Sequence, residues 1–108
     1  QRQMCIRDSK GAKHIKEISV GKGLLKYDSL LTLTHFKGHT MGGFGGSNKN
    51  ISIGCADAHT GKKQLHAGAT GQQWGITGRE FMENMVDATK GITTTSRDTS
   101  ATSMFCAA

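Results

Sequence analysis

The stretch from residue 30 to residue 55 constrains the fold of this chain more than any other. It begins with the apolar run LLTLT at residues 30–34, continues through HFKGH at residues 35–39 and ends in a glycine-rich segment. A short β-prone run bounded by glycines predicts a buried strand. Ligands of open α/β sheets bind just past the carboxyl ends of strands, so we expect any functional site of this chain in residues 35–55.

The glycine-rich segment predicts an anion site. Five glycines stand in the nine positions 38–46, where the backbone can approach a ligand closely, and successive amides in such turns form anion-binding nests. The predicted carboxylate or phosphate site consists of Lys37, Gly43, Gly45, Gly46, Lys49 and Asn50. The alternative is a tightly folded loop between two solvated lysines. The segment matches neither of the two common phosphate-loop patterns.

Histidines near this segment are candidates for catalysis. An imidazole titrates near neutral pH, so His35 and His39 are predicted as general acid or base. With Cys55 and His66, the same two histidines form a donor set that suits zinc, iron or nickel. The alternatives are hydrogen-bonded or surface histidines and a cysteine that packs as a small apolar side chain.

Two strands are predicted in the first part of the chain. Apolar residues alternate over residues 13–20, and the second strand covers residues 30–35. Spacing of apolar residues favours a short helix over residues 45–54. The small and polar residues 56–75 indicate a long surface loop, which is often functional in a compact domain.

The best-defined predicted element is a helix over residues 78–90. Thr77 and Glu80 form a capping-box pattern, and the Phe and Met stripe that follows repeats at helical spacing and is expected to be core. Gly91 is predicted to end this helix. The predicted fold class is α/β: about two or three strands, a glycine-rich loop and a C-terminal amphipathic helix, as part of a larger layered domain.

Composition limits the size of the core and the choice of partners. With 15 glycines, no proline and six aromatic residues in 108, we expect a small core and marginal stability. The net charge of +6 favours anionic ligands, but the basic residues are scattered, which argues against a nucleic-acid-binding module. Of the three cysteines, only Cys55 lies outside the two ends that look foreign, so no disulfide and a reducing cytoplasm are expected. No apolar run approaches about 20 residues, so no membrane contact is expected.

Several motifs together resemble one family. They are HFKGH at residues 35–39, GFGG at 43–46, KN at 49–50 and GC at 54–55, and the resemblance extends through Gly61-Lys62, His66 and residues 80–82. The chain resembles the uncharacterised iron-sulfur-centre protein family, domain of unknown function 362. The resemblance implies a partial α/β domain over residues 10–92.

This resemblance also implies a function. Full-length relatives are implied to carry a four-iron four-sulfur cluster, but the cysteine motif for that cofactor is absent here, since a cluster needs several thiolates. The first functional hypothesis is a redox or metal-dependent protein with a His, Lys and Gly-rich site. The alternative is a non-catalytic module that binds a small anion or docks an electron-transfer partner. Nucleic-acid binding is a weaker alternative.

Both ends of the chain look foreign to the family. Residues 1–9 resemble a translated sequencing adapter and are left out of the predicted fold. Residues 93–108 are polar and patternless, so they are predicted to be a disordered or frameshifted tail. The chain is accordingly expected to be a fragment of a longer protein.

Overall fold

The computed structural model describes residues 4–9, 11–68, 75–76, 78–93 and 102–107, without the side chains of Met4 and of residues 102–107. In chain order the elements are β1 (Met4–Asp8), β2 (Glu17–Gly21), the 3-10 helix η1 (Lys22–Lys26), β3 (Leu30–His35), β4 (Lys37–His39), β5 (Gly43–Gly45), α1 (Ser47–Cys55), α2 (Gly61–Ala67), α3 (Gly78–Thr93) and β6 (Thr102–Ala107). The predicted α/β class is confirmed, although the described ranges contain six strands rather than two or three.

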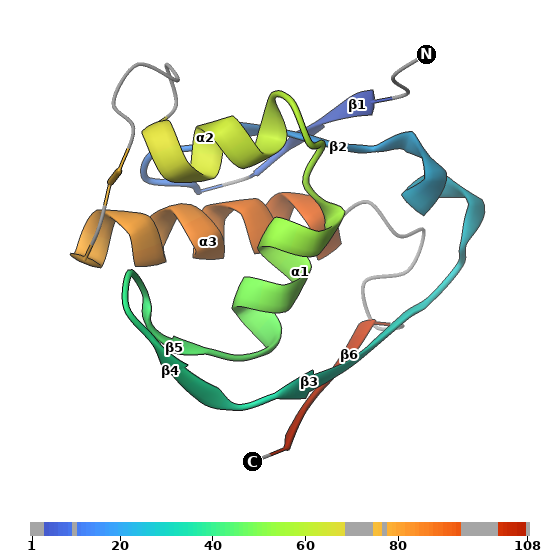
Figure 1. Ribbon diagram of the computed structural model, residues 1–108. Coiled ribbons are helices and arrows are strands. Elements are labelled where there is room, and N and C mark those ends of the chain that lie inside the picture. Colours follow the sequence, from blue (N-terminus) through green and yellow to red (C-terminus); the bar gives the residue numbers. More distant parts are fainter. Residues whose placement is uncertain (1–3, 10, 69–74, 77, 94–101, 108) are drawn as a thin grey trace.

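Helix α3 is the centre of the fold. It contacts α1, α2, β1 and β2, and Figure 1 shows it between the β1–β2 pair and α1. The predicted core stripe is confirmed for Phe81 and Met85, which are buried with Ile18, Val20, Ile51, Leu65, Ala88 and Ile92. It is wrong for Met82 and Val86, which are 39% and 41% exposed on the outer face.

The C-terminal end of α3 differs from the propensity rule that predicted its stop. The predicted cap at Thr77 lies outside the described residues, and the predicted stop at Gly91 is wrong because α3 continues to Thr93. Gly91 is buried, and a β-carbon there would lie 2.6 Å from the Ile18 Cγ2 atom. Glycine therefore allows close packing of α3 on β2. No helix in the described ranges is long and apolar enough to cross a membrane.

The strands form three separate pairs. β1 and β2 are antiparallel, β4 and β5 are antiparallel, and β3 runs parallel to β6 with Leu30 opposite Thr102. The predicted bounds of β3 are confirmed, but its predicted burial is wrong: Thr32 is buried, whereas Leu31 and Leu33 are 62% and 73% exposed. The strand predicted over residues 13–20 begins only at Glu17.

The two chain ends contribute strands to this fold. Residues 4–8 form β1, in which Cys5 lies opposite Val20, so leaving them out of the fold was wrong. Their origin as a translated adapter stays a prediction. Of the predicted tail, residues 94–101 and 108 lie outside the described residues, and residues 102–107 form a strand rather than a disordered end. The frameshift stays a prediction.

The segment after α1 covers the edge of β2 that β1 leaves open. The predicted long surface loop over residues 56–75 is wrong for residues 61–67, which form α2, while residues 69–74 lie outside the described ranges. The Gln64 side chain accepts from the Ser19 amide at 3.2 Å and donates to the Glu17 carbonyl at 2.8 Å. The Asp57 amide donates to the Ser19 carbonyl at 2.8 Å. These bonds tie α2 to β2.

A cluster of charges joins the N-terminal segment to α3 at the surface. Glu83 contacts His14 Nε2 at 2.7 Å, accepts from Arg79 Nε at 2.8 Å and accepts from Lys13 Nζ at 3.3 Å. The bonds from His14 and Arg79 lower the pKa of Glu83 to about 2. The ionised form of Glu83 is therefore the form that the folded chain favours.

We expect Glu83→Gln to lower the melting temperature at pH 7 and to have no effect near pH 2. The folded pKa lies below the ordinary value of 4.5, so the contribution of Glu83 is present above about pH 4.5 and is lost as the pH falls toward 2. Circular dichroism melts from pH 7 to pH 2 measure this. Glu80→Gln, an exposed change on the same helix, is the control. A Glu83→Gln effect that is constant with pH would contradict this account.

Candidate functional site

The predicted site region borders a cavity. The cavity is open to solvent, is bordered by β3, the β4–β5 pair and α1, and has a volume of about 440 Å³. Five of the six predicted anion-site residues line it: Lys37, Gly45, Gly46, Lys49 and Asn50. The predicted sixth residue, Gly43, does not line it; it lies opposite His39 at the turn of the hairpin, with a φ of 75° that suits glycine. The sequence prediction therefore located the cavity but not its full outline.

Strand pairing and the start of α1 position the two lysines. Lys37 lies opposite Gly45 in the β4–β5 pair, and Lys49 lies in the first turn of α1. A β-carbon at Gly45 would lie 3.6 Å from Lys49 Cδ and 3.7 Å from Lys37 Cγ. The aliphatic stems of both lysines thus pass over the same glycine, and both lysines line the same cavity.

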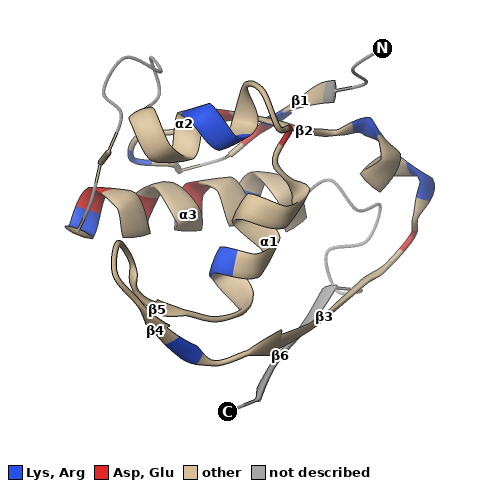
Figure 2. Ribbon diagram, viewed as in Figure 1, with Lys and Arg blue, Asp and Glu red and all other residues tan. Residues whose placement is uncertain are grey.

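The cavity has a positive electrostatic character. The described residues of its lining include no aspartate or glutamate, and the first turn of α1 has no acidic residue. Figure 2 shows basic positions on β4 and α1 and no acidic position on either element. The N-terminus of a helix carries a partial positive charge, which adds to the two ammonium groups. A bound anion would be favoured by each of these features.

Asn50 links the two walls of the cavity. Its Nδ2 atom donates to Thr34 Oγ1 at 2.9 Å, which joins α1 to β3. Sequence reasoning missed Thr34 and the other new lining residues Leu33, Ile53 and Gly54. The only sequence signal for Thr34 was its place at the end of the predicted strand. Asn50 is therefore a residue that holds the walls together as well as a lining residue.

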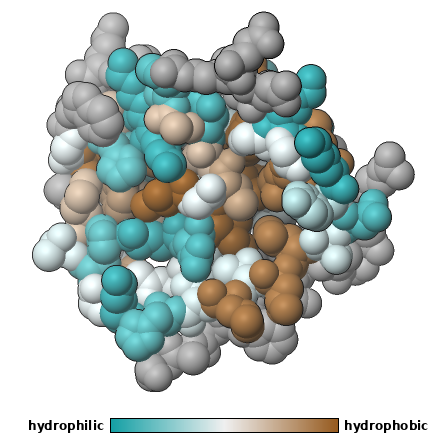
Figure 3. Space-filling view, turned by 45° about the vertical axis from the view of Figure 1, so that its right-hand side comes forward, coloured by the Kyte–Doolittle hydropathy of each residue, from teal (hydrophilic) through white to brown (hydrophobic). Residues whose placement is uncertain are grey.

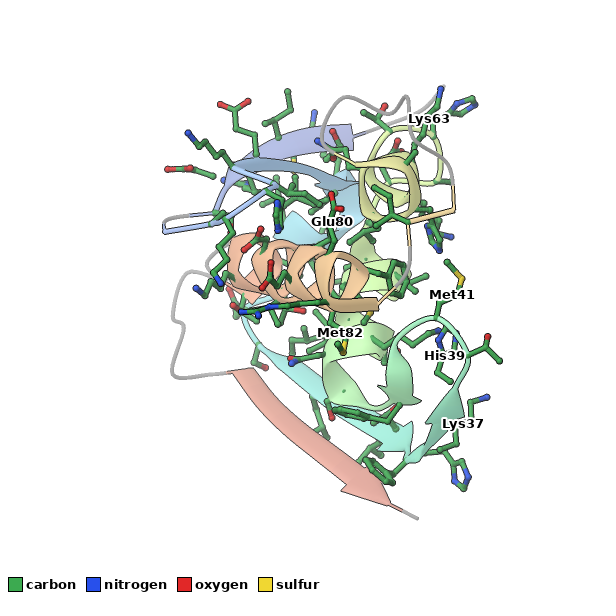
Figure 4. The ribbon with its side chains drawn as sticks, turned by 90° about the vertical axis from the view of Figure 1, so that its left-hand side faces the viewer. Lys37, His39, Met41, Lys63, Glu80 and Met82 are labelled. Carbon is green, nitrogen blue, oxygen red and sulfur yellow. The ribbon has the colours of Figure 1, made fainter. Side chains whose placement is uncertain are left out.

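His39 has a structural task that the sequence did not reveal. Its Nδ1 atom accepts from the amides of Met41 and Gly42 at 3.3 and 3.1 Å, so Nδ1 is unprotonated. Burial lowers the pKa of His39, and the positive charges of Lys49 and Lys37 lower it further. Figure 4 shows His39 and Lys37 on the same strand, β4. The neutral ring, which does not line the cavity, holds the hairpin turn in place.

The predicted metal ligands occupy different places. His35 lines the cavity, whereas Cys55 is the last residue of α1 and lines a second space between α1 and β3. Burial raises the pKa of the Cys55 thiol. His39 and His66 both contact Phe81, with ring centroids 6.4 and 5.4 Å from the phenyl ring. His66 Nδ1 lies 2.8 Å from the Lys62 carbonyl. Among the described residues, no three His, Cys, Asp or Glu side chains are grouped as a metal site.

Comparison with protein families decides the affiliation of the chain. The sequence model of the family described as Domain of unknown function (DUF362) matches residues 2–107. The chain belongs to the DUF362 family. No curated protein and no solved structure gives a match. DUF362 membership confirms the resemblance carried by the motifs of residues 35–55, and the match includes the residues of β1 and β6.

A four-iron four-sulfur cluster does not fit the cysteines of this DUF362 chain. Such a cluster needs four thiolates, and the chain has three cysteines. Among the described side chains, Cys5 lies in β1 and Cys55 at the end of α1, both as free thiols. We therefore assign no cluster chemistry to these residues. The residues that the fold does bring together are the lysines and glycines of the cavity.

Proposed function

We propose that this DUF362 chain binds a small anion, with a carboxylate or phosphate group, in the cavity between β3, the β4–β5 pair and α1. The observation that carries the proposal is the passage of the Lys37 and Lys49 stems over Gly45, in a cavity with no acidic residue among its described lining residues. Two cations and a helix start without an acidic residue supply charge-assisted hydrogen bonds to an anion.

The two histidines have different roles in this proposal. His35 is one of the lining residues of the cavity, whereas His39 is not. His39 accepts hydrogen bonds from two backbone amides and so holds the β4–β5 hairpin in place. Its role in the site is to position this hairpin. A catalytic role for either histidine, and metal binding by His35, His39, Cys55 and His66, stay predictions. Anion binding requires neither.

We expect Lys49→Ala to weaken binding of inorganic phosphate and of butyrate about tenfold. A charge-assisted hydrogen bond contributes about 1.5 to 3 kcal/mol, and partial exposure of the lysine places the effect near the lower value. Lys37→Ala is expected to act in the same direction and less strongly, because Lys37 is exposed. NMR titration, followed through the amide signals of Gly45 and Gly46, measures both affinities.

Lys63→Ala is the matched control, because it removes the same charge from an exposed position on α2 that does not line the cavity. We expect this variant to bind phosphate as the unaltered chain does. The affinity should also fall as salt rises, since salt screens exposed charges. If Lys37→Ala and Lys49→Ala both bind like Lys63→Ala, the cavity is not an anion site and the proposal is wrong.

A further inference from the structure

The outer side of β3 and of the β4–β5 hairpin carries four large apolar side chains. Leu31 and Leu33 are 62% and 73% exposed, and Phe36 and Phe44 are 50% and 53% exposed. We call these four side chains the outer face. Figure 3 shows apolar side chains gathered on the surface over β3. Exposed apolar patches of this kind, when they are contiguous, mark interaction sites.

Strand alternation directs both leucines away from α1. Successive side chains of a strand point to opposite faces. Thr32 is buried and α1 contacts β3, so Thr32 lies on the covered face, and Leu31 and Leu33 lie on the other. β3 runs parallel to β6, and parallel sheets normally have both faces covered. Among the described elements α1 contacts both strands, which leaves the side of the two leucines uncovered.

The two phenylalanines extend the outer face onto the hairpin. Phe44 lies opposite Gly38 in the β4–β5 pair, so its ring is on the side away from His39, which contacts α3. The ring centroids of Phe36 and Phe44 are 5.4 Å apart. Figure 1 shows β3 and the hairpin along one side of the molecule, with α1 and α3 on the other side of them. The four side chains therefore share one surface.

The area of the outer face suits the centre of an interface. An aromatic side chain buries about 150 to 250 Å² when it is covered. Two half-exposed rings thus offer roughly 100 Å² each, and the two more exposed leucines offer a similar area. The total of about 400 Å² is half of the roughly 800 Å² that each partner contributes to a standard complex. A polar rim normally supplies the rest of an interface.

The charge of this surface selects the kind of partner. Residues 29–36 contain no Lys, Arg, Asp or Glu, and Figure 2 shows no charged position on β3. The stem of the neighbouring Lys37 lies on the cavity side, over Gly45. An acidic protein or an anionic membrane would therefore gain no ion pair at the centre of the outer face. A second copy of the chain presents the same uncharged apolar face, which matches in chemistry and in area.

We propose that two copies of this chain associate through their outer faces, as a two-fold symmetric dimer in which the β3 and hairpin surfaces pack face to face. Identical patches meet in such an interface, so each leucine and each phenylalanine is buried twice. Each copy has a net charge of +6, so the two copies repel each other through solvent. Dimer formation does not require the proposed anion site.

Sedimentation equilibrium of the full chain tests the proposal. We expect a monomer at about 2 µM and mostly dimer at about 200 µM, as for an interface of modest area. The dissociation constant should fall as salt rises from about 0.05 to about 0.5 M, because salt screens the repulsion between the two copies. Amide signals that shift with protein concentration in NMR spectra of the unaltered chain should be those around Leu31, Leu33, Phe36 and Phe44.

Two substitutions on the outer face should weaken the dimer. Leu31→Ser and Phe44→Ser should each raise the dissociation constant at least about tenfold, because each change occurs twice in the dimer. Both positions are exposed, so the melting temperature of the monomer should change little. Leu25→Ser and Met82→Ser are the matched controls, at positions that are 41% and 39% exposed outside the outer face. Both controls should dimerise as the unaltered chain does.

Each contrary result overturns the proposal. A monomer at the higher concentration in low and high salt would show that the outer face binds no second copy. A dimer that both outer-face variants retain would use another surface. A dimer that salt weakens would depend on opposite charges rather than on apolar contact. Binding of anionic vesicles or of an acidic protein by a monomer, if it is lost in Leu31→Ser, would assign the outer face to that partner instead.

Discussion

Replacing Asp87 with alanine is expected to lower the free energy of unfolding by about 3 to 5 kcal/mol, because three backbone amides, of which that of Ile15 is buried, would lose a charged acceptor. The Asp87 side chain is 3% exposed and accepts three backbone bonds, from the amides of Lys13, His14 and Ile15 at 3.2, 2.9 and 3.1 Å. Its own carbonyl accepts from Ser9 Oγ at 2.6 Å. Asp87 thus fastens the segment before β2 to α3.

Asp57→Ala provides the matched comparison for this prediction. The Asp57 carboxylate also accepts from two amides, those of His59 and Thr60 at 3.1 and 2.9 Å, but at the surface. Its replacement should cost about 1 kcal/mol, as for a helix cap whose amides can bond to water. Asp87→Asn keeps one acceptor and should lie between the two. Urea unfolding followed by circular dichroism measures all three variants.

The comparison isolates burial as the cause of the larger effect. Water can replace a lost acceptor at the surface, whereas the amide of Ile15 is buried and would be left unpaired. Asp87 is also more deeply buried than Asp57, so Asp87→Asn, which keeps the size of the side chain, separates lost packing from lost hydrogen bonds. If Asp87→Ala lowers the free energy of unfolding no more than Asp57→Ala does, the three hydrogen bonds from backbone amides to Asp87 do not hold the N-terminal segment on α3.

The elements that the sequence predicted best are those with local signals. The bounds of β3 follow from a β-prone run between turn residues, and most of α3 follows from apolar residues at helical spacing. The helix predicted over residues 45–54 is found as α1 at residues 47–55. Each of these signals is contained within about fifteen neighbouring residues.

Features that depend on distant residues were predicted wrongly or not at all. Gly91 continues α3 because Ile18, far away in the chain, leaves no space for a side chain. Asp87 resembles a solvated helix residue until residues 13–15 lie on it. Local propensity gives way to tertiary contacts at such positions. The spacing of Asn84, Asp87 and Gly91 on one face of α3 was the available sequence signal.

The candidate site shows the same division. The glycine-rich segment and its flanking lysines were identified because residues 35–55 form one local unit, and that unit lines the cavity. The role of His39 was not predicted, because it depends on a hairpin turn that directs two backbone amides at one ring nitrogen. The exposure of Leu31 and Leu33 was not predicted, because β3 reads as a buried strand and this exposure follows only from the packing.

The second large effect is expected at Gly61, the first residue of α2. Gly61→Ala should destabilise the fold by about 2 to 4 kcal/mol, since overpacking against rigid backbone costs about 1 to 3 kcal/mol and occasionally more. A β-carbon at this position would overlap the carbonyl oxygen of Ser19 and lie 3.0 Å from Ala56 Cβ. The Ser19 carbonyl belongs to β2 and cannot move as a flexible side chain would.

A movement that relieves the overlap between a β-carbon at residue 61 and the Ser19 carbonyl would weaken hydrogen bonds between α2 and β2. A shift of α2 away from β2 would stretch the bond from the Asp57 amide to Ser19 and both bonds of the Gln64 side chain. Since β2 also packs on α3 through Ile18, the displacement reaches the core. The effect of one methyl group is therefore expected to be cooperative, with a lower unfolding midpoint and unchanged dependence on urea.

Gly54→Ala is the control, because the same substitution is expected to change the stability in the opposite direction there. Gly54 lies in α1, and a β-carbon there would meet nothing nearer than Asn50 Oδ1 at 3.7 Å. Alanine in an open helical position should stabilise the fold by up to about 1 kcal/mol. The same Gly to Ala change is thus expected to act in opposite directions at residues 54 and 61. Two stabilising or neutral results would show that α2 does not lie directly on the backbone of β2.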